Sequence, residues 1–307
     1  MKLKAFCLIL LFNIFITTAH AQVAFSCNDG PFIVGATSSQ PTPNLYQINT
    51  STIPFTFTVV STTGSNISYN AIGYRISDNL IYGIEEAGVG SSSANLVQID
   101  ATGTTTDLGL INGLPIDRYI SGDFDTSGNY YVSNSESNTI FIIDVDSRAV
   151  TNQFSYTANY RFSDLSYNPV DGMLYAISTI NTLAPDEAGQ LLRIDPSNGS
   201  LTEVGNSSGG NSGIGSISFD ANGTLYAVDN LSVGVYSINI SNGNTTLIST
   251  SPAFSRADSA HCANAIFSGP TPVLPPVAVP TLTIFGIIFA ALLLLYNLNK
   301  TVFRKTV

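Results

Sequence analysis

Residues 123–129 place oxygen-bearing side chains at alternating positions before a glycine. Asp123 and Asp125 have the spacing of carboxylates in loops that bind calcium, a hard cation that prefers oxygen ligands. Such a loop normally carries a glutamate at its twelfth position, where this chain has Asn134. The pattern therefore favours a hairpin turn built from Asp, Asn and Gly. We predict no cofactor, with calcium at Asp123 and Asp125 as the alternative. Similar turn residues occupy the same place in two other segments, at 168–172 and 220–223.

Carboxylates also follow an isoleucine at Asp100, Asp144 and Asp195, once in each of three segments. A residue repeated at one position is typical of a turn at a strand end, whereas catalysis usually needs a cluster unlike its surroundings. A Ser-His-Asp site would need His261, which lies beside Cys262. We find no phosphate-binding loop, dinucleotide fingerprint or zinc-binding helix motif in the sequence. We therefore predict that the protein is not an enzyme. The alternative is a calcium-dependent hydrolase or lactonase that uses Asp123, Asp125 and Asp164.

Two cysteines, Cys27 and Cys262, lie near the two ends of the body of the chain. An even number of cysteines in an oxidising compartment predicts a disulfide. Zinc would normally need four ligands, and His261 is the one suitable histidine nearby. We therefore predict a Cys27–Cys262 disulfide.

The elements that must position these residues are short strands, because apolar residues alternate in short runs separated by Gly, Asn, Asp and Ser. A sequence pattern of four consecutive strands recurs with a spacing of about 45 to 50 residues. This spacing matches a propeller blade and exceeds the repeat length of most solenoids. We therefore predict an all-β, five-bladed β-propeller. Four complete copies begin at 70–74, 120–124, 162–167 and 214–219.

The fifth copy is divided between the two ends of the body. Phe32–Ala36, Leu45–Asn49 and Phe55–Val60 match its second, third and fourth strands. We predict that Ala263–Phe267 supplies the missing first strand, because its sequence is similar to that of residues 70–74. A ring closed in this way has no free sheet edges.

The first strands of the copies carry small or polar residues on one face, as expected where five strands surround a narrow channel. We predict that Ala71, Ser121, Asp164, Ser216 and Asn264 occupy equivalent positions on that face.

The Asn-Ala-Ile-Gly-Tyr sequence at 70–74, the Leu-Tyr-Ala sequences at 174–176 and 225–227, the Arg-Ile-Asp-Pro turn at 193–196 and Cys262 resemble a bacterial family of secreted repeat domains of unknown function. More loosely, the body is similar to the YVTN and NHL propeller repeats of surface proteins. The resemblance implies a propeller fold and no particular activity.

The two ends predict export and anchoring. Lys2 and Lys4, an apolar run and a small-residue site form a secretory signal over residues 1–21, with cleavage between Ala21 and Gln22. The propeller domain would span 22–268 and a stiff Pro-rich linker 269–281. Residues 282–298 are predicted to form a transmembrane helix, followed by a basic cytoplasmic tail at 299–307.

The start of this helix resembles the IPTL-type C-terminal sorting signals of Gram-negative bacteria, which implies a sorting or processing enzyme as a partner. That family usually has Ser-Glu-Trp-Gly after the Pro-Thr-Leu, whereas this chain has residues 283–286 as Thr-Ile-Phe-Gly. The residues that carry the resemblance are Val279, Pro280, Thr281, Leu282 and Gly286.

The exported body holds six arginines, no lysine and all 21 acidic residues, for a formal charge of −15. This charge argues against nucleic acid as a partner. We predict a non-enzymatic protein of the cell envelope or cell surface that presents its propeller to an extracellular or periplasmic ligand or protein. A purely structural component of the envelope is a further alternative.

Overall fold

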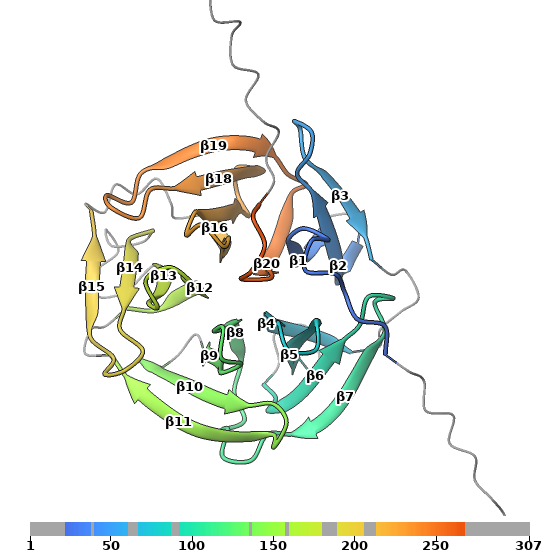
Figure 1. The fold of residues 1–307 in the computed structure, drawn as a ribbon, viewed down its shortest axis with the longest axis vertical. Helices are drawn as coiled ribbons and strands as arrows, with labels where there is room; N and C mark the ends of the chain where they lie inside the picture. Colours follow the sequence, from blue (N-terminus) through green and yellow to red (C-terminus); the bar gives the residue numbers. More distant parts are fainter. Residues whose placement is uncertain are drawn as a thin grey trace, which may run out of the picture. The chain divides into compact units, whose positions relative to one another are not determined.

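The computed structural model describes residues 22–37, 40–60, 67–86, 92–134, 137–156, 160–179, 189–205 and 213–267. Within these residues the chain forms five four-stranded antiparallel sheets arranged around a centre, a five-bladed propeller as the sequence predicts (Figure 1). The predicted signal, linker, transmembrane helix and tail lie outside the described residues. None of the described segments forms a helix with the length and apolar character needed to cross a membrane.

We number the blades from the N-terminus and give their strands from the centre outwards. Blade 1 comprises β20 (Phe254–Ala260), β1 (Phe32–Thr37), β2 (Gln40–Asn49) and β3 (Thr56–Val59). Blade 2 comprises β4 (Ser68–Arg75), β5 (Leu80–Glu86), β6 (Asn95–Ile99) and β7 (Thr105–Leu110). Blade 3 comprises β8 (Tyr119–Phe124), β9 (Tyr130–Asn134), β10 (Thr139–Asp144) and β11 (Ala149–Ser155). Blade 4 comprises β12 (Phe162–Tyr167), β13 (Leu174–Ser178), β14 (Leu191–Ile194) and β15 (Leu201–Val204). Blade 5 comprises β16 (Ile214–Phe219), β17 (Leu225–Asp229), β18 (Gly234–Ile238) and β19 (Thr245–Thr250).

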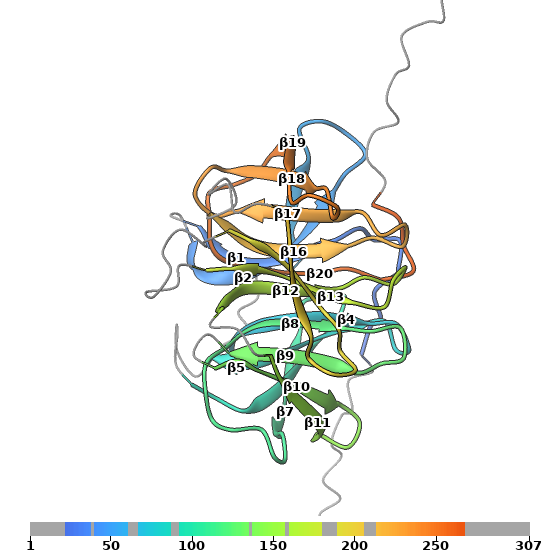
Figure 2. The same cartoon turned by 90° about the vertical axis from the view of Figure 1, so that its left-hand side faces the viewer.

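The burial of each strand follows its distance from the centre. Every residue of β9 and β13 is buried, because blades cover both faces of these strands. The outermost strands β7 and β15 keep several exposed positions. Figure 2 shows the ring from the side, with β18 and β19 near one edge and β10 and β11 near the opposite edge.

The hydrophobic core consists of five clusters, each of which joins two neighbouring blades. Aromatic pairs cross several of these boundaries: the ring centroids of Tyr82 and Phe124 lie 5.7 Å apart, and those of Tyr175 and Phe219 lie 5.1 Å apart. Such pairs contribute roughly 0.5–1.5 kcal/mol beyond the area that they bury. The ring is therefore stabilised mainly by contacts between blades.

The ring is closed by the C-terminal strand of the body, but the strand is not the predicted one. β20 pairs antiparallel with β1, with Ala260 opposite Phe32 and Asp258 opposite Val34. The prediction that Ala263–Phe267 forms this strand, with Asn264 facing the channel, is wrong. These residues instead pack on blade 5, where the Phe267 ring stacks on Tyr226 at 3.9 Å.

The centre of the ring explains this difference. Five inner strands leave room only for small or polar side chains, because protein interiors are close-packed. Ala71, Ser121, Asp164 and Ser216 are fully buried on the inner strands, and Ala71 packs in the apolar cluster between blades 2 and 3. The polar sequence of β20 fits that space, whereas Ile266 is 60% exposed and Phe267 fills an apolar site at the edge of blade 5.

Candidate functional site

The sequence-predicted carboxylates occupy two different environments. The Asp125 Oδ1 atom accepts hydrogen bonds from the backbone N–H groups of Ser127 and Asn129, at 2.9 Å each. Asp220 does the same for Asn222 and Thr224 in blade 5. Asp125 is therefore a turn residue that joins β8 to β9.

The Ile-Asp carboxylates also belong to turns. Asp100 accepts hydrogen bonds from the N–H groups of Thr102 and Thr104, and Asp195 accepts one from Ser197. In Asp144, Oδ1 accepts a hydrogen bond from the N–H group of Asp146 at 3.0 Å. Each of these aspartates shapes the connection between the third and fourth strands of its blade.

Asp123 and Asp164 instead lie in the channel, where the structure brings them together with Asp258 on β20. All three carboxyls interact electrostatically with one another. Asp164 and Asp258 are fully buried, and Asp123 is partly buried.

Each of the three carboxyls joins its inner strand to the next one around the ring. The Oδ2 atom of Asp258 accepts the Ile72 N–H at 2.6 Å, and that of Asp164 accepts the Ile217 N–H at 2.7 Å. Asp123 Oδ2 accepts the N–H of Tyr167 at 2.9 Å and the hydroxyl of Ser166 at 2.7 Å. The carboxyls thus tie β20 to β4, β12 to β16, and β8 to β12.

Burial raises the pKa of all three carboxyls, because the low-dielectric channel disfavours their charged form. The pKa of Asp123 rises to about 7, with burial as the main cause and the nearby Asp125 charge as a smaller one. The pKa values of Asp164 and Asp258 lie well above the ordinary value, and repulsion from neighbouring carboxyls adds to the effect of burial. Asp164 and Asp258 therefore favour the protonated, uncharged form.

A pocket of about 270 Å³ lies where the inner strands begin, at one end of the channel. We call it the mouth pocket. All five blades contribute to its wall, which carries two arginines, two asparagines and a serine beside several apolar residues. The lining residues are Asn70, Arg118, Ile120, Ser163, Gly213, Ile214, Gly215, Asn230, Leu231, Arg256 and Ala257.

A β-bulge in each inner strand positions these residues. Ile120 in β8, Ser163 in β12 and Gly215 in β16 have no partner residue opposite them in the adjacent strand. In β20 the bulge contains Arg256 and Ala257. In β4 the bulge directly follows Asn70. Bulges redirect side chains and interrupt the regular ladder, and they are common beside binding sites. The mouth pocket is therefore built by one irregularity repeated in all five blades.

Arg256 has a φ of +58°, a left-handed conformation that is rare outside glycine and asparagine. Such a conformation costs on the order of 1–2 kcal/mol for a residue with a side chain. The bulge thus holds this arginine in a strained backbone at the pocket wall. Strained residues of this kind are enriched at functional sites.

The two arginines of the mouth pocket face one buried glutamate. Arg118 Nε lies 3.7 Å from Glu86 Oε1, and Arg256 Nη1 lies 3.9 Å from Glu86 Oε2. These ion pairs are longer than the 2.7–2.9 Å typical of a charge-assisted hydrogen bond. Glu86 therefore offsets part of the positive charge that the two arginines bring to the pocket wall.

Two glycines permit the close packing of the pocket wall. A Cβ atom on Gly215 would lie 2.0 Å from Asn230 Nδ2, and one on Gly213 would lie 2.3 Å from Asp229 Oδ1. The Oδ1 atom of Asp229 accepts the N–H groups of Leu231 and Ser232 at 2.6 and 3.0 Å, which shapes the loop that carries Asn230. The loop between β17 and β18 can therefore approach the inner strand closely.

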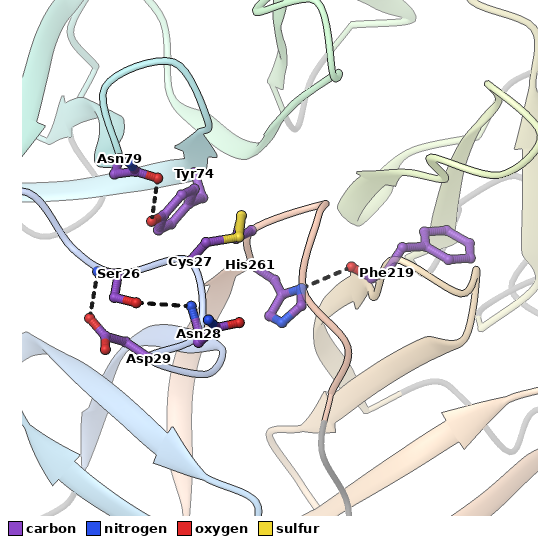
Figure 3. Close-up of a disulfide and its surroundings, with 9 residues drawn as sticks. Ser26, Cys27, Asn28, Asp29, Tyr74, Asn79, Phe219 and His261 are labelled. Carbon is purple, nitrogen blue, oxygen red and sulfur yellow. Dashed lines mark hydrogen bonds between the residues drawn. A yellow bond between two sulfur atoms is a disulfide. The ribbon is translucent and has the colours of Figure 1, made fainter.

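The other end of the channel holds the disulfide (Figure 3). Cys27 and Cys262 are joined as the sequence predicts, with their Cα atoms 5.3 Å apart and 235 positions apart in the sequence. Nearby, His261 Nδ1 donates a hydrogen bond to the Phe219 carbonyl oxygen at 3.2 Å. Burial lowers the pKa of His261 to about 4, so its imidazole is neutral near pH 7. The His261 side chain therefore packs at the end of the channel opposite the mouth pocket.

Sequence reasoning identified Asp123 and Asp164 but missed Asp258, Arg256 and Arg118. Asp258 and Arg256 were missed because the closing strand was assigned to the wrong segment. A signal was present, since Phe254-Ser255 and Asp258 match Phe162-Ser163 and Asp164 in residue type and order. Arg118 lies in the loop before β8, outside the repeated sequence pattern. Its distance from Glu86 could be learned only from the fold.

The fold and its central channel place this chain among the five-bladed β-propellers. Residues 32–264 match the family described as a repeat of unknown function (DUF6923), and the chain belongs to that family. No curated protein matches the sequence.

Several solved structures are similar to the chain at low sequence identity. The selenomethionine-substituted virginiamycin B lyase from Staphylococcus aureus is 16% identical, with a TM-score of 0.43 over 75% of this chain and 72% of the lyase. An auxiliary nutrient binding protein from Bacteroides thetaiotaomicron is 11% identical, with a TM-score of 0.42 over 72% of this chain and 57% of that protein.

Proposed function

We propose that the chain is a non-enzymatic, exported binding protein whose ligand enters the mouth pocket. The observation that carries this proposal is the construction of that pocket: five bulges present the residues of all five blades to one cavity of about 270 Å³. Ligand pockets commonly have volumes of about 300–1,000 Å³, so this pocket suits a small ligand or the end group of a larger one.

The engagement of the channel carboxyls supports binding over catalysis. Asp123, Asp164 and Asp258 each accept backbone N–H groups from a neighbouring inner strand, which occupies them in holding the ring together. Asp125 shapes a turn, and His261 lies at the opposite end of the channel. The alternative calcium-dependent enzyme would require Asp123, Asp125 and Asp164 to leave these roles.

A pocket-filling variant tests the proposal. Ser163 is the bulge residue of β12, so Ser163→Trp places an indole in the mouth pocket. Thr202→Trp, on the exposed side of β15, is the matched control. We expect glycans or small molecules found by array screening of the full chain to bind wild type and Thr202→Trp, and not Ser163→Trp. Ligands that bind all three proteins equally would show that the mouth pocket is not the site.

We further propose that the propeller domain, residues 22–268, is anchored outside the cytoplasm by the segment 282–298 after removal of residues 1–21. The support is the sequence pattern of both ends. N-terminal sequencing should give Gln22 as the first residue of the mature protein. A chain that ends before Leu282 should appear in the soluble exported fraction, whereas retention in the membrane would contradict the anchor.

Processing at the C-terminal end is a separate proposal. A sorting enzyme would recognise the segment around Pro280, Thr281 and Gly286 and release the propeller from its helix. Mass spectrometry of the exported protein would then show a C-terminus near this segment. A C-terminus at Val307 would show that the helix is retained.

A further inference from the structure

The mouth pocket contains buried polar atoms whose hydrogen-bonding capacity is not used within the described part of the chain. Arg118 Nε and Arg256 Nη1 are donors that lie 3.7 and 3.9 Å from the Glu86 carboxylate, too far for hydrogen bonds, and Asn230 Oδ1 is an acceptor. All three residues line the pocket. A buried polar atom without a hydrogen bond lowers the stability of the folded protein, so a bound molecule that supplies the missing partner stabilises it. A ligand that satisfies them must carry acceptors for the arginines and a donor for the asparagine.

The charge of the pocket wall limits the ligand further. Arg118 and Arg256 carry two positive charges, and Glu86, whose side chain is only 3% exposed, carries one negative charge. Among the described residues, the only charged ones that line the pocket itself are the two arginines, so the lining favours an anionic group such as a carboxylate. A phosphate would bring nearly two negative charges beside Glu86, and the excess charge would be repelled. A neutral ligand would leave the arginine donors without a charged acceptor.

The floor of the pocket does not oppose an anion. Asp164 and Asp258 follow the lining residues Ser163 and Ala257 along their strands, so they are the carboxyls immediately below the pocket. Both are fully buried, and each accepts a backbone N–H from the next inner strand. Their pKa values lie well above the ordinary range because of burial, so both favour the uncharged form.

The remaining wall of the pocket is apolar on one side and hydrogen-bonding on the other. Leu231 lines the pocket and is 78% exposed, and Ile120 lies on the β8 bulge. Ser163 and Asn70 add short polar side chains from β12 and β4. A sugar ring has both characters, because its C–H face is apolar while its edge carries hydroxyl groups.

Building on the proposed function, we propose that the mouth pocket binds a sugar acid, a hexuronic acid or the uronate end of a glycan. Its carboxylate would be held by Arg118 and Arg256. A ring hydroxyl would donate to Asn230 Oδ1, and the C–H face of the ring would pack on Leu231. The arginine pair then selects the acid over the neutral hexose of the same shape.

Isothermal titration of the full chain in detergent with galacturonate and glucuronate, and with galactose and glucose as neutral counterparts, tests this proposal. We expect at least one uronate to bind at least about tenfold more tightly than its neutral counterpart, because a hydrogen bond to a charged group is lost in the neutral sugar. Arg118→Gln should weaken uronate binding at least about tenfold. Arg193→Gln removes the same charge from β14, outside the pocket, and should leave binding unchanged. Circular dichroism melting curves establish that both variants are folded.

Three outcomes would overturn the sugar-acid assignment: no binding of either uronate, equal binding of uronate and neutral sugar, or uronate binding that Arg118→Gln leaves unchanged. The proposed function fails separately. A ligand from the array screen that is excluded by Ser163→Trp but is indifferent to Arg118→Gln would keep the mouth pocket as a binding site and reject the acid. Ligands that Ser163→Trp does not exclude would reject the pocket itself.

Discussion

The carboxyl of Asp123 should make the stability of the propeller depend on pH in an unusual direction. Its pKa is raised from 3.8 to about 7 by burial in the channel. The folded state therefore binds the proton more tightly than the unfolded chain does. The stabilising contribution of this group is fully present below pH 3.8 and is lost as the pH rises to about 7. Most globular proteins lose stability in the opposite direction, as acid protonates paired carboxylates.

The magnitude follows from the pKa difference. At about 1.4 kcal/mol per pKa unit, the rise corresponds to an upper value of about 4 kcal/mol. Asp123 is partly exposed, and solvent reduces the effect, so we expect about 2–4 kcal/mol. Asp123→Asn mimics the protonated carboxyl and removes the penalty of ionising it. The variant should therefore be more stable than wild type at pH 8 by this amount, and similar in stability at pH 4.

Urea unfolding of the oxidised full chain in detergent at pH 4, 6 and 8 measures this difference. Asp164 and Asp258 titrate in both proteins, and loss of the Asp123 charge removes one cause that raises the pKa of each. Asp195→Asn is the control, because hydrogen bonds from Ser197 lower the pKa of Asp195. Because pH 4, 6 and 8 all lie above the lowered pKa of Asp195, the stability difference between that variant and wild type should be the same at all three pH values. A constant difference between Asp123→Asn and wild type at all three pH values would refute the reasoning.

Three further substitutions test the ring itself. Replacing Cys27 and Cys262 by alanine removes a cross-link across 235 positions. Loop-closure entropy predicts that the free energy of unfolding, measured in urea, falls by about 5 kcal/mol. A loss below about 1 kcal/mol would show that β1–β20 pairing alone closes the ring. Gly122→Ala should lower the free energy of unfolding by about 2 kcal/mol or more, because its Cβ would lie 2.3 Å from the Ala71 carbonyl oxygen. An unchanged melting temperature would contradict the close packing of β4 against β8. Val233→Asn should stabilise the protein by about 1 kcal/mol, because Val233 has a φ of +51° and is 39% exposed; a lowered melting temperature would count against backbone strain at this turn.

The propeller could be predicted because its repeats are visible as local patterns. Strand alternation and the turn residues around Asp220 and Asp195 recur once per blade, and each pattern depends on neighbours within a few positions. The disulfide could be predicted from the count and placement of Cys27 and Cys262. These inferences need no knowledge of contacts between distant residues.

The closing strand could not be identified in the same way, because two segments competed for one place. Residues 263–267 have the more strand-like sequence, with Ile266 and Phe267 apolar, whereas β20 contains Arg256 and Asp258. The deciding factor was the narrow centre of the ring, which admits the polar segment because Asp258 finds the Ile72 N–H there. This factor acts between distant residues, so local patterns do not show it.

The mouth pocket was missed for a related reason. Bulges leave no reliable mark on a single sequence, and the pocket residues come from five separate segments. Arg118 and Glu86 lie in different blades, and their approach depends on the order of the blades around the ring. The net acidic charge also concealed a local positive charge.

The bulges also make the mouth of the propeller easy to diversify. Ile120, Ser163 and Gly215 each stand outside the ladder of hydrogen-bonded pairs, so a replacement there leaves the strand register below it unchanged. Because these positions line one cavity, their replacements should act together on a bound ligand and have non-additive effects. A combinatorial library that varies Ile120 and Ser163 together could therefore yield new specificities on an unaltered frame, whereas Gly215 must stay small beside Asn230. Descendants of one such ring could acquire different ligands through a few substitutions.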